Sequence, residues 1–195
     1  SIAGDMGYEA LAPFLTMGAA EVVLPPGVFL QAVAEAEAAM AQLVVSAVGK
    51  AKKVVDLFAG VGAFTFRLAK ASKVFASDSD KVAIAALVAA SKKTSGLKPI
   101  EAISRDLFRE PMSGTELNAY DAIVFDPPRA GAEAQAKMIA RSNVKTVVAV
   151  SCNPATLARD VRILVDGGYA LERVTPIDQF LYAAHVEAVA VLRRK

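Results

Sequence analysis

Short apolar runs alternate along this chain with longer segments in which apolar residues recur every three or four positions. The short runs predict buried strands, and the longer segments predict amphipathic helices. The first expected strand begins at Lys53, and four more cover 73–77, 100–103, 122–125 and 147–150. The expected helices cover 29–48, 63–70, 81–93, 132–142 and 154–166. Regular alternation of this kind is typical of an α/β fold, with a doubly wound and mostly parallel sheet.

The two ends of the chain depart from this alternation. Two strands are expected at 171–175 and 186–192, and no helix fits between them, so they should pair antiparallel. Near the start, a short strand at 21–24 is ended by Pro25-Pro26-Gly27. We expect 1–28 to be an N-terminal extension, the remnant of a preceding domain, and 29–195 to be one α/β domain.

Composition narrows the function classes. The chain has 195 residues, which suits one domain, and no run is long and charge-free enough to span a membrane. No signal peptide is evident, and a single Cys and a single His exclude an internal disulfide and offer no metal-site spacing. We therefore expect a cytoplasmic protein without a metal. The net charge of +2 neither requires nor excludes a nucleic-acid partner.

Polar residues follow the expected strands at their carboxyl ends. In a doubly wound sheet these ends lie along one edge, where ligands bind. The residues in question are Asp56, Asp78, Asp106, Asp126 and Cys152, with Gly60 and Gly62 in the first turn. A lone G-x-G is a weak signal. Two compatible roles are open for Asp78: it binds a ribose hydroxyl, or it caps the N-terminus of the helix that follows.

Cys152 lies between an apolar strand and a helix that Asn153 should cap and Pro154 should begin. A helix dipole favours a thiolate, but by less than about one pKa unit. An ordinary thiol is only roughly 3% ionised at pH 7. Position alone therefore leaves two equal interpretations, a reactive thiol and a small buried apolar side chain.

At this point the chain resembles the class I S-adenosylmethionine-dependent methyltransferases, and more closely the catalytic domain of the RNA uracil-C5 (5-methyluridine) methyltransferases. The resemblance covers roughly 29–192. The segments that carry it are Phe29-Leu30-Gln31, Asp56-Leu57-Phe58-Ala59-Gly60-Val61-Gly62, Asp126-Pro127-Pro128-Arg129-Ala130-Gly131, Ser151-Cys152-Asn153-Pro154-Ala155-Thr156-Leu157-Ala158-Arg159-Asp160 and His185-Val186-Glu187. The Ser-Cys-Asn-Pro block is the most specific of them.

The resemblance implies methyl transfer from S-adenosylmethionine to C5 of a uridine in tRNA or rRNA. We expect the protein to be a monomer. Cys152 falls on the nucleophile and Glu187 on the general base. The implied cofactor-binding positions are Gln31, Phe58, Asp78, Asp106 and Asp126, and Asp56, Gly60 and Gly62 join them at the same edge. Glu187 could otherwise be an exposed strand carboxylate, and the roles of His185 and Arg129 stay open.

Two other functions compete with this one. An amino-group methyltransferase also places an acidic residue or Asn before Pro-Pro, but an aromatic residue normally follows, where this chain has Arg129. A cofactor-binding module that is inactive without an RNA-binding domain is the second alternative. The chain also departs from the family pattern at Val33 and Ala63, where Asn is frequent, and this affects details of cofactor contact rather than the reaction.

Overall fold

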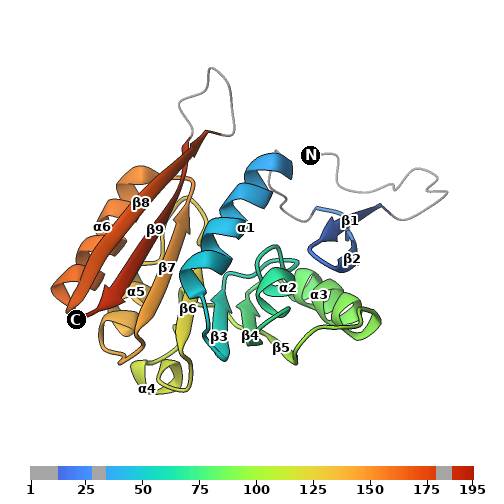
Figure 1. Cartoon of the computed structure of the whole chain (residues 1–195), viewed down its shortest axis with the longest axis horizontal. Coiled ribbons are helices and arrows are strands. Elements are labelled where there is room, and N and C mark those ends of the chain that lie inside the picture. The colour runs from blue at the N-terminus through green and yellow to red at the C-terminus, as the bar shows by residue number, and fades with distance from the viewer. Residues whose placement is uncertain (1–12, 28–33, 179–185) are drawn as a thin grey trace.

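A computed structural model of the chain describes residues 13–27, 34–178 and 186–195 (Figure 1). A seven-stranded sheet runs in the order β5-β4-β3-β6-β7-β9-β8. Its strands are β3 (Lys53–Leu57), β4 (Lys73–Asp78), β5 (Ile100–Ser104), β6 (Ala122–Phe125), β7 (Thr146–Ser151), β8 (Tyr169–Asp178) and β9 (Val186–Arg194). β3 to β7 are mutually parallel, while β9 is antiparallel to β7 and to β8. The predicted doubly wound α/β fold is confirmed, including its antiparallel end.

Helices cover both faces of the sheet. α1 (Ala34–Val48), α2 (Thr65–Leu68) and α3 (Lys81–Lys93) lie on one face, and α4 (Gly114–Leu117), α5 (Glu133–Ala140) and α6 (Pro154–Asp166) lie on the other. Val54, Val124 and Val148 pack on the α1 face, whereas their neighbours Val55 and Ile123 pack on the α5 and α6 face. Burial on both faces explains why these strands read as continuous apolar runs.

Element boundaries differ from the sequence predictions where tertiary contacts decide them. The expected helix over 63–70 is only the four residues of α2, and the expected helix over 29–48 is described from Ala34 onward. α4 was not expected, because a four-residue helix leaves no periodicity; a capping box between Ser113 and Glu116 forms it. β8 extends beyond both ends of the predicted 171–175.

A separate two-stranded sheet precedes the main one. β1 (Phe14–Met17) pairs antiparallel with β2 (Ala20–Val23), close to the strand expected at 21–24. Met17, Ala20 and Val22 are buried with apolar residues of α3, so this hairpin rests on the sheet through that helix. None of the helices in the described ranges is long and apolar enough to cross a membrane.

Candidate functional site

The strand register brings the predicted site residues to one edge of the sheet. Leu57 of β3 lies between Ser77 of β4 and Phe125 of β6, so the backbone segments that follow these three strands leave the sheet side by side. The backbone N–H of Asp126 donates to the Leu57 carbonyl at 3.2 Å. β7 ends at Ser151, directly before Cys152. Asp56, Asp78, Asp126 and Cys152 are therefore neighbours at the carboxyl edge.

The turn after β3 is held in an uncommon backbone conformation. Phe58 has φ of 62°, which is uncommon for a residue with a side chain, and Gly60 and Gly62 also have positive φ. A Cβ on Gly62 would lie 2.7 Å from a ring carbon of Phe66, whereas nothing lies within 4 Å of one on Gly60. The backbone at Gly60 is therefore open to a close approach by a ligand.

Asp78 ties this turn to β4. Its Oδ2 accepts a hydrogen bond from Gly60 N at 2.9 Å, and its Oδ1 accepts one from Asp80 N at 2.8 Å. Asp80 is the N-cap of α3, since its Oδ1 accepts from the N–H groups of Val82 and Ala83. The alternative that Asp78 caps this helix is wrong, because the residue immediately before Lys81 does so.

Asp106 lies two residues beyond β5 and organises the turn that follows it. Its Oδ1 accepts hydrogen bonds from Phe108 N at 3.0 Å and Arg109 N at 3.3 Å. The Phe108 ring contacts the Phe58 ring, with centroids 5.5 Å apart, so the turns after β5 and β3 meet. Two candidates from the sequence, Gln31 and His185, lie outside the described residues.

Two carboxylates at this edge are held in conditions that favour their neutral forms. Asp56 is fully buried, and its Oδ2 accepts a 2.6 Å hydrogen bond from Thr65 Oγ1. Burial and the charge of Asp78 raise the pKa of Asp56 to about 7. Burial raises the pKa of Asp126 to about 8, and the negative charges of Glu187 and Asp56 add to this effect. Thr65 is not among the residues expected at the site, because a single threonine in a helix carries no motif signal of its own.

Cys152 lies at the turn between β7 and α6. Asn153 caps the helix through a 3.1 Å hydrogen bond from Ala155 N, and Pro154 opens it, as predicted. The thiol is partly exposed, so it is not simply a buried apolar side chain. Burial and the charges of Glu187 and Asp126 raise the pKa of Cys152, while Arg129 opposes them.

Glu187 is buried beside the cysteine. Ala188, the next residue of β9, pairs with Ser151, the residue before Cys152. Glu187 is only 8% exposed, and its Oε2 has no hydrogen-bond partner among the described residues. Burial raises its pKa. The alternative of an exposed strand carboxylate is wrong, because β9 lies between β7 and β8 and is covered on both faces.

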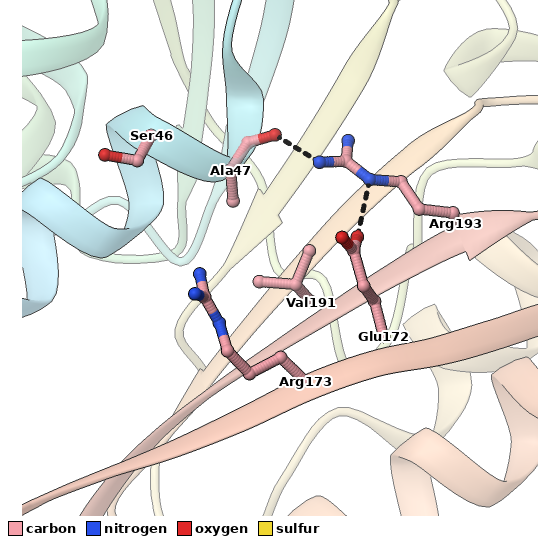
Figure 2. A pocket seen from close by; sticks show the side chains of 6 residues that line it. All are labelled: Ser46, Ala47, Glu172, Arg173, Val191 and Arg193. Atoms are coloured by element: carbon pink, nitrogen blue, oxygen red, sulfur yellow. Dashed lines mark hydrogen bonds and ion pairs between the residues drawn. The ribbon is translucent and has the colours of Figure 1, made fainter.

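A surface hollow elsewhere in the molecule is not part of this site (Figure 2). It lies where the end of α1 meets β8 and β9, and Arg193 crosses it to bind Ala47 O at 2.9 Å and Glu172 Oε2 at 3.0 Å. Arg193 pairs with Thr146, the first residue of β7, whereas Cys152 follows the last. The hollow is thus at the opposite edge of the sheet.

Comparison with known sequences identifies relatives over the whole described fold. The family model of the tRNA (uracil-5-)-methyltransferases matches residues 23–195. An uncharacterized RNA methyltransferase of Brucella melitensis is 56% identical over 191 residues, which are 98% of this chain and 46% of that protein. The 23S rRNA (uracil(1939)-C(5))-methyltransferase of Chromohalobacter salexigens is 37% identical over 171 residues, or 87% of this chain and 35% of that protein. The chain thus spans about half the length, or less, of these curated relatives.

Solved structures agree with the sequence comparison. The tRNA (uracil-54, C5)-methyltransferase of Pyrococcus abyssi, in complex with S-adenosyl-L-homocysteine, superposes with a TM-score of 0.79 at 28% identity, over 92% of this chain and 44% of that one. The N-methyltransferase NodS of Bradyrhizobium japonicum shares the fold alone, with a TM-score of 0.65 at 19% identity, over 82% of this chain and 86% of that one. By the extent of the family match, this chain is a member of the tRNA (uracil-5-)-methyltransferase family.

Proposed function

We propose that the chain is the catalytic part of an enzyme that transfers a methyl group from S-adenosylmethionine to C5 of a uridine in tRNA or rRNA. The observation that carries this proposal is the placement of Cys152 beside Glu187 and Asp126 at the carboxyl edge of the sheet. Residues 29–195 would form the catalytic domain, as a monomer, and 1–28 an extension of it.

The residue types at this edge suit the chemistry of uracil. C5 of uracil is too weak a nucleophile to attack a methyl group unaided. If Cys152 adds to C6 as the thiolate, a C–S bond forms, the C5–C6 π electrons move into an enolate, and C5 can then accept the methyl group. The C5 proton then passes to the Glu187 carboxylate, the C6–S bond breaks, and the thiolate leaves. One nucleophile and one separate base complete the cycle.

The same edge suits a positively charged cofactor. Asp56 Oδ1 and Glu187 Oε2 are buried oxygens without a hydrogen-bond partner in the described parts of the chain, and buried polar atoms of this kind are normally satisfied. Asp56, Asp78 and Asp126 offer carboxylates, and Gly60 offers open backbone. S-Adenosylmethionine would supply the methyl group from its sulfonium, while these residues would hold its charged groups and ribose.

This arrangement predicts that cofactor affinity rises with pH. Asp56 and Asp126, with pKa values of about 7 and about 8, are largely neutral at pH 6 and ionise as the pH rises. Because a cation binds better to ionised carboxylates, affinity for S-adenosylmethionine should increase about tenfold between pH 6 and 7.5. Calorimetry at several pH values measures this. Asp56→Asn should flatten the profile, and a flat profile in the unmodified chain would contradict the prediction.

Asp78 supplies a second prediction about the cofactor. Asp78→Ala should weaken binding by about 1.5–3 kcal/mol, since it removes charge-assisted hydrogen bonds to ribose hydroxyls and the acceptor for Gly60 N. Titration with S-adenosylhomocysteine measures the loss. The control is Asp80→Ala, which removes the cap of α3 but leaves the Asp78 carboxylate in place. Unchanged affinity in the Asp78 variant would remove this residue from the site.

Mapping of the methylated nucleoside tests the proposal as a whole. The chain and the full-length Brucella relative are each incubated with S-adenosylmethionine and transcripts of tRNA and 23S rRNA, and the digested RNA is analysed by mass spectrometry. We expect 5-methyluridine. A product methylated on an exocyclic nitrogen would favour the amino-group alternative. Product from the longer protein alone would mean that this chain is the inactive binding module.

A further inference from the structure

Helix α6 holds the loop after β6 through several side chains. The loop backbone 129–132 lies along the first turns of the helix that follows Cys152. Asn153 Nδ2 and Thr156 Oγ1 both donate to the Arg129 carbonyl, at 3.0 and 3.3 Å. Arg159 Nη2 donates to the next carbonyl, that of Ala130, at 3.1 Å. Two consecutive loop carbonyls are therefore fixed by one helix.

Asp160 anchors the end of the same loop. Its side chain is buried, and Asp160 Oδ2 accepts a short, 2.6 Å hydrogen bond from Ala132 N. Its Oδ1 accepts from Arg159 Nε at 2.9 Å, which orients the guanidinium that binds Ala130. A charged acceptor makes both bonds stronger than neutral ones would be. Asp160 thus holds the loop directly and also through Arg159.

The close packing of loop and helix depends on Gly131. A Cβ at this position would lie 2.5 Å from Arg159 Nη2 and 2.8 Å from Asp160 Oδ2, and its φ of 73° also favours glycine. A side chain here would therefore push the loop away from α6. The loop is built to lie against the helix.

The placement of this loop bears on the nucleophile. Asn153, the residue after Cys152, donates its side-chain amide to the Arg129 carbonyl, so the loop is tied to the turn that carries the sulfur. The positive charge of Arg129 also opposes the carboxylates that raise the pKa of Cys152. We propose that Asp160 is a positioning residue, which holds 129–132 against α6 and so keeps the Arg129 guanidinium within electrostatic reach of the Cys152 sulfur. The inference rests on the proposed function for its meaning in catalysis, but the loop contacts are independent of it.

Thiol alkylation tests the positioning role without RNA. The rate of Cys152 alkylation by iodoacetamide is measured from pH 6 to 10 in the unmodified chain and in Asp160→Asn, which keeps the shape but loses the charge. We expect a higher thiol pKa and at least about threefold slower alkylation at pH 7.5, with Arg129→Gln changing the profile in the same direction. The matched control is Asp166→Asn, on the same helix, whose ion pair with Arg162 faces solvent. An unchanged profile in folded Asp160→Asn would overturn the proposal.

A second measurement separates positioning from general stability. If the unmodified chain methylates RNA, Asp160→Asn and Gly131→Ala should each lower kcat about ten- to a hundredfold, and the double variant should lose little more than either. Thermal unfolding is followed in parallel, and Thr156→Val replaces Asp160→Asn if that variant does not fold. Loss of thermal stability with kcat unchanged would mean a purely structural role. No methylation by the unmodified chain would refute the proposed function instead, and the alkylation profile would still decide this inference.

Discussion

Cys152→Ala should abolish methyl transfer to RNA while leaving cofactor binding intact. Without the sulfur, C6 of uracil has no nucleophile and C5 stays unreactive, so the rate should fall by at least about 10⁴-fold. The carboxylates proposed to bind the cofactor, Asp56 and Asp78, belong to β3 and β4 and not to the turn that carries Cys152. The measurement is transfer of a labelled methyl group, with calorimetry of S-adenosylhomocysteine as the control for folding.

Cys152→Ser sharpens this test. A serine hydroxyl has nearly the same shape but ionises far less readily, so the variant should be as inactive as the alanine variant. Methylation by either variant at the rate of the unmodified chain would show that Cys152 is not the nucleophile. The amino-group alternative would then gain, because such an enzyme has no need of a thiol.

Glu187→Gln should trap the enzyme on its product. The amide keeps the shape of the side chain but cannot accept the C5 proton, so elimination of the cysteine should fail after the methyl group has been transferred. Turnover should fall by roughly 10²–10⁴-fold, while methyl transfer in a single turnover should suffer much less. Quenched-flow kinetics with labelled cofactor measure both rates.

The environment of Glu187 fits this role. Burial raises its pKa, so it is a stronger base than an ordinary carboxylate when ionised. Its Oε2, which accepts no hydrogen bond from the residues that the structure describes, is available to a proton. A variant of the exposed Glu172, at the opposite edge of the sheet, serves as the control for the loss of one carboxylate. Normal multiple turnover by Glu187→Gln would mean that another group or water takes the proton.

The parts of the fold that periodicity encodes were predictable. The strand at 122–125 was expected with the bounds of β6, because both faces of the sheet are covered and its residues are apolar without interruption. Helix α6 was equally clear, since Asn153, Pro154 and Gly167 mark its ends. The carboxyl-edge arrangement of Asp56, Asp78, Asp126 and Cys152 followed from the parallel topology alone.

Features that depend on tertiary contacts could not be predicted in this way. An alternation such as that of Val186, Ala188 and Ala190 is typical of a strand with one exposed face. β9 is instead buried on both faces, and this is why Glu187 is shielded. Thr65 and Asp160 lie in ordinary helical sequence, and only the folded chain shows that they bind Asp56 and the loop after β6. Asp80 rather than Asp78 caps α3, a difference of two residues that propensity cannot resolve.

The covalent step through Cys152 is tested most directly by RNA that contains 5-fluorouridine at the target position. A base can remove hydrogen from C5 as a proton, but it cannot remove fluorine as a cation. The reaction should therefore stop after addition of the sulfur and transfer of the methyl group. Intact-mass analysis of the chain mixed with this RNA and S-adenosylmethionine should show an adduct that carries one added methyl group, and peptide mapping should place it on Cys152. Methylation of the corresponding uridine RNA without any adduct from the fluorinated RNA, or an adduct on another residue, would contradict the account.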